Sequence, residues 1–75
     1  MLFLEIRSTT TNPKHELIPV FGPLSDEIAS RKSAYQRLGY KNQGQVWYDY
    51  DQHQWTGEIT FTHPRETVVM EVTKL

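Results

Sequence analysis

The sequence contains no cysteine and no long apolar run. Without cysteine, the fold cannot rely on disulfides or on a thiolate zinc site, and catalysis by a cysteine nucleophile is excluded. No stretch reaches the roughly 20 apolar residues of a membrane-spanning helix. The first residues, MLFLEIRSTT, have no basic leader before their short apolar run, which is typical of a strand and not of a signal peptide. These absences favour a cytoplasmic protein.

The chain also lacks a strong charge of either sign, because its formal net charge is −1. Such a balance argues against an extended nucleic-acid footprint. Six Lys/Arg stand against four Asp/Glu in residues 1–42, and two against five in residues 43–75. What the sequence does have is aromatic side chains, which make up 12% of its 75 residues. Each of them buries a large area, so they can support one small core.

The N-terminal part predicts strands followed by a helix. LFLEIR alternates apolar side chains and has the composition of a strand. ELIPVF predicts a second, short strand, and Pro19 places it at an edge because proline lacks the N–H that a neighbouring strand would need. A helix is then expected from Ser25, which suits an N-cap, to about Leu38, with Gly39 as a left-handed C-cap.

Arg31 interrupts the apolar stripe that we expect on this helix. The stripe consists of residues at helical spacing: Leu24, Ile28, Ala34, Tyr35 and Leu38. Two interpretations of Arg31 are open. Its aliphatic stem can lie along the core while the guanidinium reaches water, or the guanidinium can have a bidentate carboxylate or ligand partner.

Residues 44–75 predict a three-stranded meander. If Gln52 and His53 form the first tip, Tyr50 lies opposite Trp55 and Tyr48 opposite Gly57. The second turn, HPRE, has proline where a type I turn favours it, and it places Phe61 opposite Val68, Ile59 opposite Met70 and Gly57 opposite Val72. Together the two turns place one apolar face on the same side: Val46, Tyr48, Tyr50, Trp55, Ile59, Phe61, Val68, Met70 and Val72. From this face we expect four residues to be buried between sheet and helix: Tyr48, Trp55, Phe61 and Met70.

These elements predict an α+β domain over residues 1–75. It has a small antiparallel sheet of four or five strands, in β-β-α-β-β-β or β-α-β-β-β order, with one helix packed on one face. In the meander, Glu58 and Glu71 are expected to lie opposite each other on the outer face. Like charges at such positions are unfavourable, which suggests that Lys74 or a partner's cation lies near them.

The stretch DYDQHQW raises the question of a metal or catalytic site. Asp49 and Asp51 alternate with tyrosines, and the register directs both to the solvent face. Outward positions on one strand lie about 7 Å apart, too far for both to ligate one ion at about 2–2.5 Å. We therefore interpret the stretch, including His53, as the exposed side of a hairpin and expect no metal ion or cofactor. His15 and His63 stand beside prolines with no supporting nucleophile, so no catalytic residue is predicted.

Outward apolar residues are the main indication of function. Trp47 and Val69 fall on the solvent face of the meander, and Phe3 falls on the outer face of the first strand. In one interpretation, residues 8–22 fold over them. In the other they form an apolar patch, with Asp49 and Glu58 at its rim, that binds another protein or a second copy. The sequence thus suggests a non-catalytic interaction module, for example a small adaptor, regulator or inhibitor, which binds through the outer sheet face or an edge strand.

A weak nucleic-acid-binding domain is the alternative. Its contacts would be the basic residues of the helix and its flank: Arg31, Lys32, Arg37 and Lys41. Binding through the sheet is disfavoured because the aromatic hairpin belongs to the acidic half of the chain. A small enzyme or enzyme subunit is the third possibility.

Overall fold

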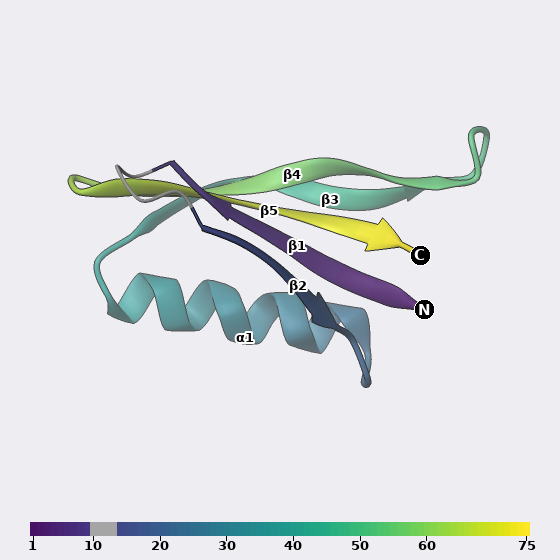
Figure 1. Cartoon of the computed structure of the whole chain (residues 1–75), viewed down its shortest axis with the longest axis horizontal. Coiled ribbons are helices and arrows are strands. Elements are labelled where there is room, and N and C mark those ends of the chain that lie inside the picture. Colours follow the sequence, from purple (N-terminus) through teal and green to yellow (C-terminus); the bar gives the residue numbers. More distant parts are fainter. Residues whose placement is uncertain (10–13) are drawn as a thin grey trace.

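The computed structural model describes residues 1–9 and 14–75, and within them the chain forms five strands and one helix. In chain order these are β1 (Leu2–Ser8), β2 (His15–Pro19), α1 (Leu24–Arg37), β3 (Lys41–Asp49), β4 (Gln54–His63) and β5 (Glu66–Lys74). The strands form an antiparallel sheet in the order β2-β1-β5-β4-β3, and α1 crosses one face of it (Figure 1). The predicted fold class is confirmed, and of the two element orders the one with two strands before the helix is correct.

The core lies between the sheet and α1 and draws mainly on β1, β4 and β5. Seven apolar side chains form it: Leu4, Ile6, Ile59, Phe61, Val68, Met70 and Val72. Phe61 and Met70 are buried as expected, whereas Tyr48 and Trp55 are only partly buried. They lie in the half of the β3–β4 hairpin nearer its turn, and this half extends past the end of the helix (Figure 1).

The helix contributes half-buried side chains and none that is fully buried. Leu24, Ile28 and Tyr35 pack against the core, and the Tyr35 ring stacks on Phe61 with a centroid distance of 4.4 Å. Two members of the predicted stripe are exposed instead: Ala34 and Leu38. At 100° per residue both positions lie toward one edge of the stripe, away from its centre at Leu24, Ile28 and Tyr35, and 68% of the Leu38 surface is accessible.

The predicted C-terminal end of the helix is correct, and the predicted N-cap is wrong. Gly39 has φ +91° at the C-terminal end, the left-handed conformation expected of it, and the Tyr40 N–H donates to the Tyr35 carbonyl at 3.0 Å. Ser25 is not the N-cap, because the helix already begins at Leu24 after Pro23, and no side chain caps it.

The predicted register of the β3–β4 hairpin is wrong by two residues. Tyr48 lies opposite Trp55, and the turn comprises residues 50–53 instead of Gln52 and His53 alone. The Asp49 carboxylate closes this longer turn by accepting hydrogen bonds from the N–H groups of Asp51 at 3.0 Å and Gln52 at 3.2 Å. Tyr50 therefore lies in the turn and is 79% exposed, contrary to its expected place on the core face. Between β4 and β5, the predicted pairs Phe61–Val68 and Ile59–Met70 are present. The third predicted pair, Gly57–Val72, is absent because the pairing of the two strands ends at Ile59 and Met70.

Candidate functional site

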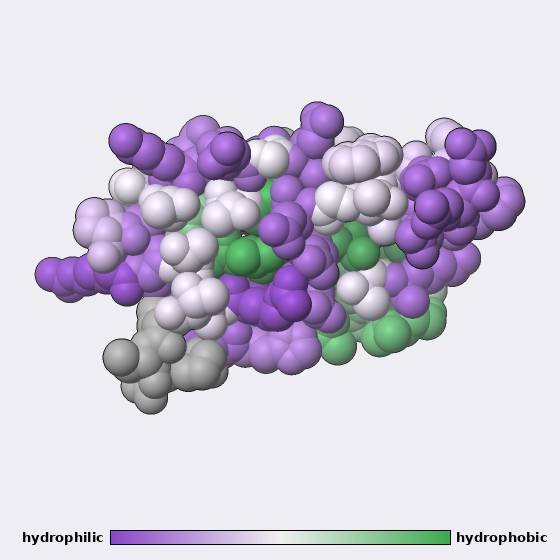
Figure 2. Space-filling model, turned by 90° about the horizontal axis from the view of Figure 1, so that it is seen from above, coloured by the Kyte–Doolittle hydropathy of each residue, from purple (hydrophilic) through white to green (hydrophobic). Residues whose placement is uncertain are grey.

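The face of the sheet opposite α1, here called the outer face, is not covered by any element among the described residues. Figure 2 shows this face from above. Hydrophilic and intermediate residues occupy most of it, and hydrophobic residues appear as separate small areas between them. Strand alternation explains the pattern, because the side chains adjacent to each core residue point outward. On β1, for example, Phe3, Glu5 and Arg7 alternate with the core residues Leu4 and Ile6.

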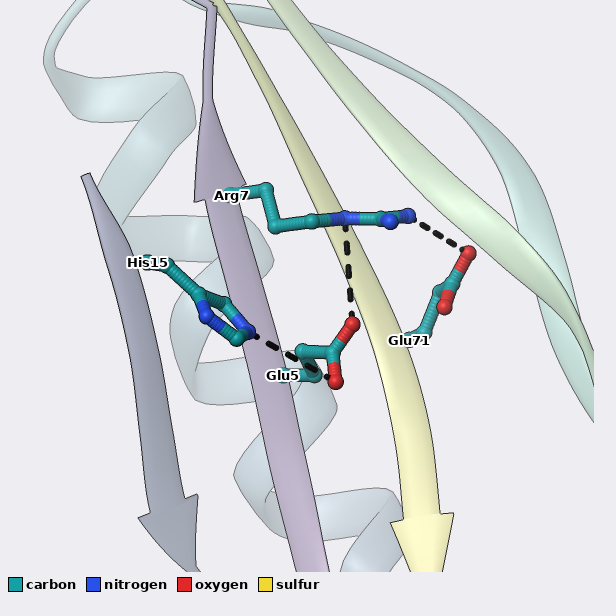
Figure 3. Close-up of polar contacts among 4 residues, drawn as sticks. All are labelled: Glu5, Arg7, His15 and Glu71. Atoms are coloured by element: carbon teal, nitrogen blue, oxygen red, sulfur yellow. Dashed lines mark hydrogen bonds and ion pairs between the residues drawn. The ribbon is translucent and has the colours of Figure 1, made fainter. Parts of the chain in front are cut away.

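A charged cluster occupies the part of the outer face formed by β2, β1 and β5 (Figure 3). The Arg7 guanidinium donates a hydrogen bond to Glu71 at 2.8 Å, and its Nε lies 3.8 Å from Glu5. The Nε2 atom of His15 lies 3.6 Å from the other Glu5 oxygen. The register produces this cluster by placing Glu5 directly opposite Glu71, and Arg7 directly opposite His15.

Glu58 adds a third carboxylate beside Glu71. Burial raises the pKa of Glu71, and the neighbouring carboxylates Glu58 and Glu5 raise it further, whereas Arg7 lowers it. The net direction is upward despite the short Arg7 contact, because burial and two like charges outweigh one partly exposed ion pair. The expectation that Lys74 supplies the nearby cation is wrong. Lys74 lies opposite Leu2, a position on the core side of the sheet, and Arg7 takes the expected role.

Trp47 lies on the outer face of β3 and is 47% exposed. One side of its ring rests on Gly57, where a Cβ atom would collide with the indole and with the Gln45 carbonyl. Gly57 has φ +86°, a conformation that glycine adopts without strain. The glycine therefore makes room for Trp47 and not, as the predicted register implied, for Tyr48.

The interpretation that residues 8–22 fold over Trp47 is wrong for the part of that segment that the structure describes. Strand β2 pairs with β1 at the sheet edge opposite β3. Ile18 and Val20 pack against the core on the helix side. Residues 10–13 lie outside the described part of the chain.

The remaining predicted site residues do not join Trp47 in a single patch. Phe3 lies between Pro19 and Thr73 in neighbouring strands, while Val69 lies between Arg7 and Thr60. Asp49 is half-buried and engaged in closing its turn. A shallow groove of about 400 Å³ does bring Val69 and Glu58 together with residues near β1 and β2: Arg7, Ser8, Thr9, Lys14 and His15.

The basic residues of the nucleic-acid alternative do not share one surface. At 100° per residue, Arg31, Lys32 and Arg37 point to three different sides of α1. Arg31 is half-buried, and its Nε lies 4.0 Å from Glu27, too far for a hydrogen bond. Among the described residues this is its one ion pair, so no bidentate protein carboxylate holds it. Lys41 belongs to β3 and points to the outer face, away from the helix.

Sequence reasoning missed a polar cluster on the core side of the sheet. The Tyr40 hydroxyl donates a short hydrogen bond to Glu66, and the Ser8 hydroxyl donates to the other Glu66 oxygen at 2.9 Å. These two bonds lower the pKa of Glu66, while the carboxylate raises the pKa of Tyr40 to about 12. The sequence HPRE predicted only a turn, and Gly39 only the end of the helix. The contact between Glu66 and Tyr40 depends on how the segments on either side of them pack.

The histidines and the DYDQHQW carboxylates are not gathered into a metal-binding set. His15 contacts Glu5, the His63 ring lies 4.8 Å from the Tyr40 ring, and His53 is exposed in the hairpin turn. Within residues 1–9 and 14–75, no group of three or more His, Cys, Asp or Glu residues could hold a metal ion. No helix in that described part is long and apolar enough to cross a membrane.

Comparisons with protein-family models, with curated proteins and with solved structures found no match to this chain.

Proposed function

We propose that this chain is a non-catalytic protein-interaction module that binds its partner on the outer face of the sheet. One observation carries the proposal: α1 covers one face of a five-stranded sheet, while the other face, described above, presents a half-exposed tryptophan. Tryptophan is among the residues most enriched at the energetic centres of protein interfaces. Its position on Gly57 holds the ring in place before any partner arrives, which reduces the entropy lost on binding.

The charge of the outer face defines the kind of partner. Glu5, Glu58 and Glu71 outnumber Arg7 and Lys41 there, and Glu58 is exposed without an ion pair among the described residues. Two copies packed through this face would bring these carboxylates together, at a cost in free energy. A partner that presents lysine or arginine beside an apolar residue fits better than a second copy. Self-association remains a measurable alternative.

Replacing Trp47 by alanine tests the proposal. We expect Trp47→Ala to reduce the free energy of unfolding by about 1 kcal/mol, as for a partly exposed site. Partner binding should weaken by about 2 kcal/mol or more, because an anchor residue is lost. Phe21→Ala is the matched control, since Phe21 is an exposed aromatic residue outside the sheet, in the connection between β2 and α1.

The measurement compares proteins retained from a native cell extract by the parent chain, Trp47→Ala and Phe21→Ala, together with sedimentation of each. A protein retained by the parent and by Phe21→Ala but lost with Trp47→Ala supports the proposal. Quenching of Trp47 fluorescence, with Trp55 replaced by phenylalanine, reports whether the ring becomes covered as concentration and mass increase. If Trp47→Ala retains every protein that the parent retains, and the mass is unchanged, the outer face is not the binding surface.

A further inference from the structure

Strands β4 and β5 separate before either of them ends. Their pairing runs from His63 opposite Glu66 to Ile59 opposite Met70. Beyond that point β4 continues to Gln54 paired only with β3, and β5 continues to Lys74 paired only with β1. Figure 1 shows the β3–β4 hairpin leaving the sheet while β5 follows β1 toward the chain ends. We call the space between the two diverging strands, residues 54–57 and 72–74, the β4–β5 fork.

The fork encloses a cleft of about 400 Å³ with different chemistry on its two sides. Tyr48 and Trp55 line the hairpin side, with ring centroids 5.5 Å apart and planes at 73°. Tyr50, which is largely exposed, meets Tyr48 edge to face at 5.0 Å. Val72 and Lys74 line the β5 side. The cleft therefore has aromatic walls on one side and an aliphatic floor with an ammonium group on the other.

Apart from Gly57, whose φ is +86°, the backbone on both sides of the fork is extended, and it lacks a strand partner across the gap. In the described part of the chain, no strand pairing and no other backbone hydrogen bond joins residues 54–57 to residues 72–74. Unpaired N–H and C=O groups along extended strands are a template for adding a further extended segment. Aromatic pockets beside such an edge accept the alternate side chains of the added segment.

The charge of the fork is opposite to that of the outer face. Lys74 and His53 belong to its lining, and none of its lining residues is acidic. Glu58 and Glu71 follow the last β4–β5 pair, but they point to the outer face, as does Glu5. An acidic side chain entering the fork would thus meet a cation and no competing carboxylate of the lining.

From the unpaired edges, the aromatic wall and a lysine that has no acidic residue beside it in the cleft lining, we propose that the β4–β5 fork binds an extended, acidic segment of another protein. The segment adds its backbone to the exposed strand edge, places an apolar or aromatic side chain against Tyr48 and Trp55, and directs a carboxylate to Lys74. This site is separate from the outer face, so either of the two proposals can be wrong while the other is correct.

The test uses the full chain and two defined pools of synthetic peptides of about nine residues, the length of an ordinary strand. Each pool consists of peptides in which threonine and valine alternate. The central residue is glutamate in one pool and lysine in the other, and the pools do not differ otherwise. Amide and indole resonances in ¹⁵N-labelled protein locate the binding. We expect the glutamate pool to shift the amides of residues 54–57 and 72–74 and the indole of Trp55, with slower hydrogen exchange at those amides and no shift at Val69.

Charge reversal separates this site from nonspecific attraction. Lys74→Glu should weaken binding of the glutamate pool by about 10-fold or more and improve binding of the lysine pool. Lys41→Glu makes the same change of charge on β3 outside the fork lining and should alter binding by less than about 2-fold, because separated surface charges are screened by salt. Circular dichroism verifies that both variants fold.

Three results would overturn the proposal. The first is equal binding of the two pools, and the second is an unchanged affinity in Lys74→Glu. The third is a set of fork resonances that shift with protein concentration in the absence of peptide, which would assign the fork to a second copy of the chain. The outer-face proposal is measured by the proteins that Trp47 retains, and this one by peptide-induced shifts at the fork, so failure of either proposal is distinguishable from failure of the other.

Discussion

Glu66 joins three parts of the chain through one carboxylate. It belongs to the start of β5, accepts a hydrogen bond from Ser8 at the end of β1, and accepts another from Tyr40, between α1 and β3. Because these bonds favour the charged form, the pKa of Glu66 is lowered. Their contribution to stability is therefore present at neutral pH and is lost as the pH falls through that lowered pKa. For Tyr40 the pKa is raised to about 12, so its contribution is present below its ordinary pKa and is lost as the pH rises toward 12.

Removing the Tyr40 hydroxyl should change both titrations. In Tyr40→Phe we expect the pKa of Glu66 to rise toward that of a free glutamate, and the alkaline loss of stability due to Tyr40 to disappear. An NMR titration of the Glu66 side chain, together with unfolding curves at neutral and alkaline pH, measures the two effects. Tyr50→Phe is the control, since Tyr50 lies in the exposed hairpin turn. An unchanged Glu66 titration in Tyr40→Phe would show that the bond to Tyr40 does not stabilise the carboxylate.

At the scale of the elements, the β3–β4 hairpin separates what alternation can predict from what it cannot. A shift of two residues keeps every side chain on its face, so the faces of Val46, Tyr48 and Trp47 were predicted correctly with the wrong register. The true register depends on the hydrogen bonds that Asp49 makes within the turn, and an alternating pattern carries no information about them. The β4–β5 turn was predicted because Pro64 restricts its geometry more strongly.

For the candidate site, as for the hairpin, the sequence predicted the face of the sheet on which each residue lies but not its neighbours. Alternation placed Phe3, Glu58 and Val69 on the outer face without showing that strand register separates Phe3 from Val69. The β4–β5 fork was not foreseen, because both strands are long enough to pair along their whole length. Gly57 inside a strand pattern was the available signal, since a glycine there often marks a bulge or a close approach.

The packing of α1 on the sheet should depend strongly on Phe61. This residue is fully buried and stacks on Tyr35, so Phe61→Ala should reduce the free energy of unfolding by about 3–5 kcal/mol. Tyr50→Ala, a change of similar size in the exposed turn, should alter it by less than about 0.5 kcal/mol. Denaturant unfolding of both variants measures the difference. Equal midpoints for Phe61→Ala and the parent would mean that Phe61 is not in the core.

At the scale of the whole molecule, the first and last strands of the sequence are neighbours inside the sheet. Leu4 lies opposite Val72, and the Met1 amino group lies 3.3 Å from the Leu75 carbonyl. The ends of residues 1–75 therefore meet on one side of the molecule, as Figure 1 shows.

This proximity predicts that a circular permutant will fold. We expect a chain in which about four added residues join Leu75 to Met1, and which opens between Gln52 and His53, to keep the helix and the sheet, because the opening falls in an exposed turn. Circular dichroism and denaturant unfolding compare it with the parent. A permutant opened between Met70 and Glu71 is the control, and it should not fold, since that cut lies inside a central strand. Failure of the first permutant together with success of the second would contradict the strand order.

The same strand order determines which contacts can form while the chain is being synthesised. β5 supplies Val68, Met70 and Val72 to the core and bridges β1 to β4, yet its residues leave the ribosome after those of every other strand. Until then the chain can form at most the β1–β2 pair and the helix followed by the β3–β4 hairpin, with no strand to connect them. Contacts between residues so distant in sequence form slowly because a long loop must close first. We therefore expect Leu4 and Phe61 to remain accessible to chaperones throughout translation of the preceding strands, and to become protected together once β5 inserts.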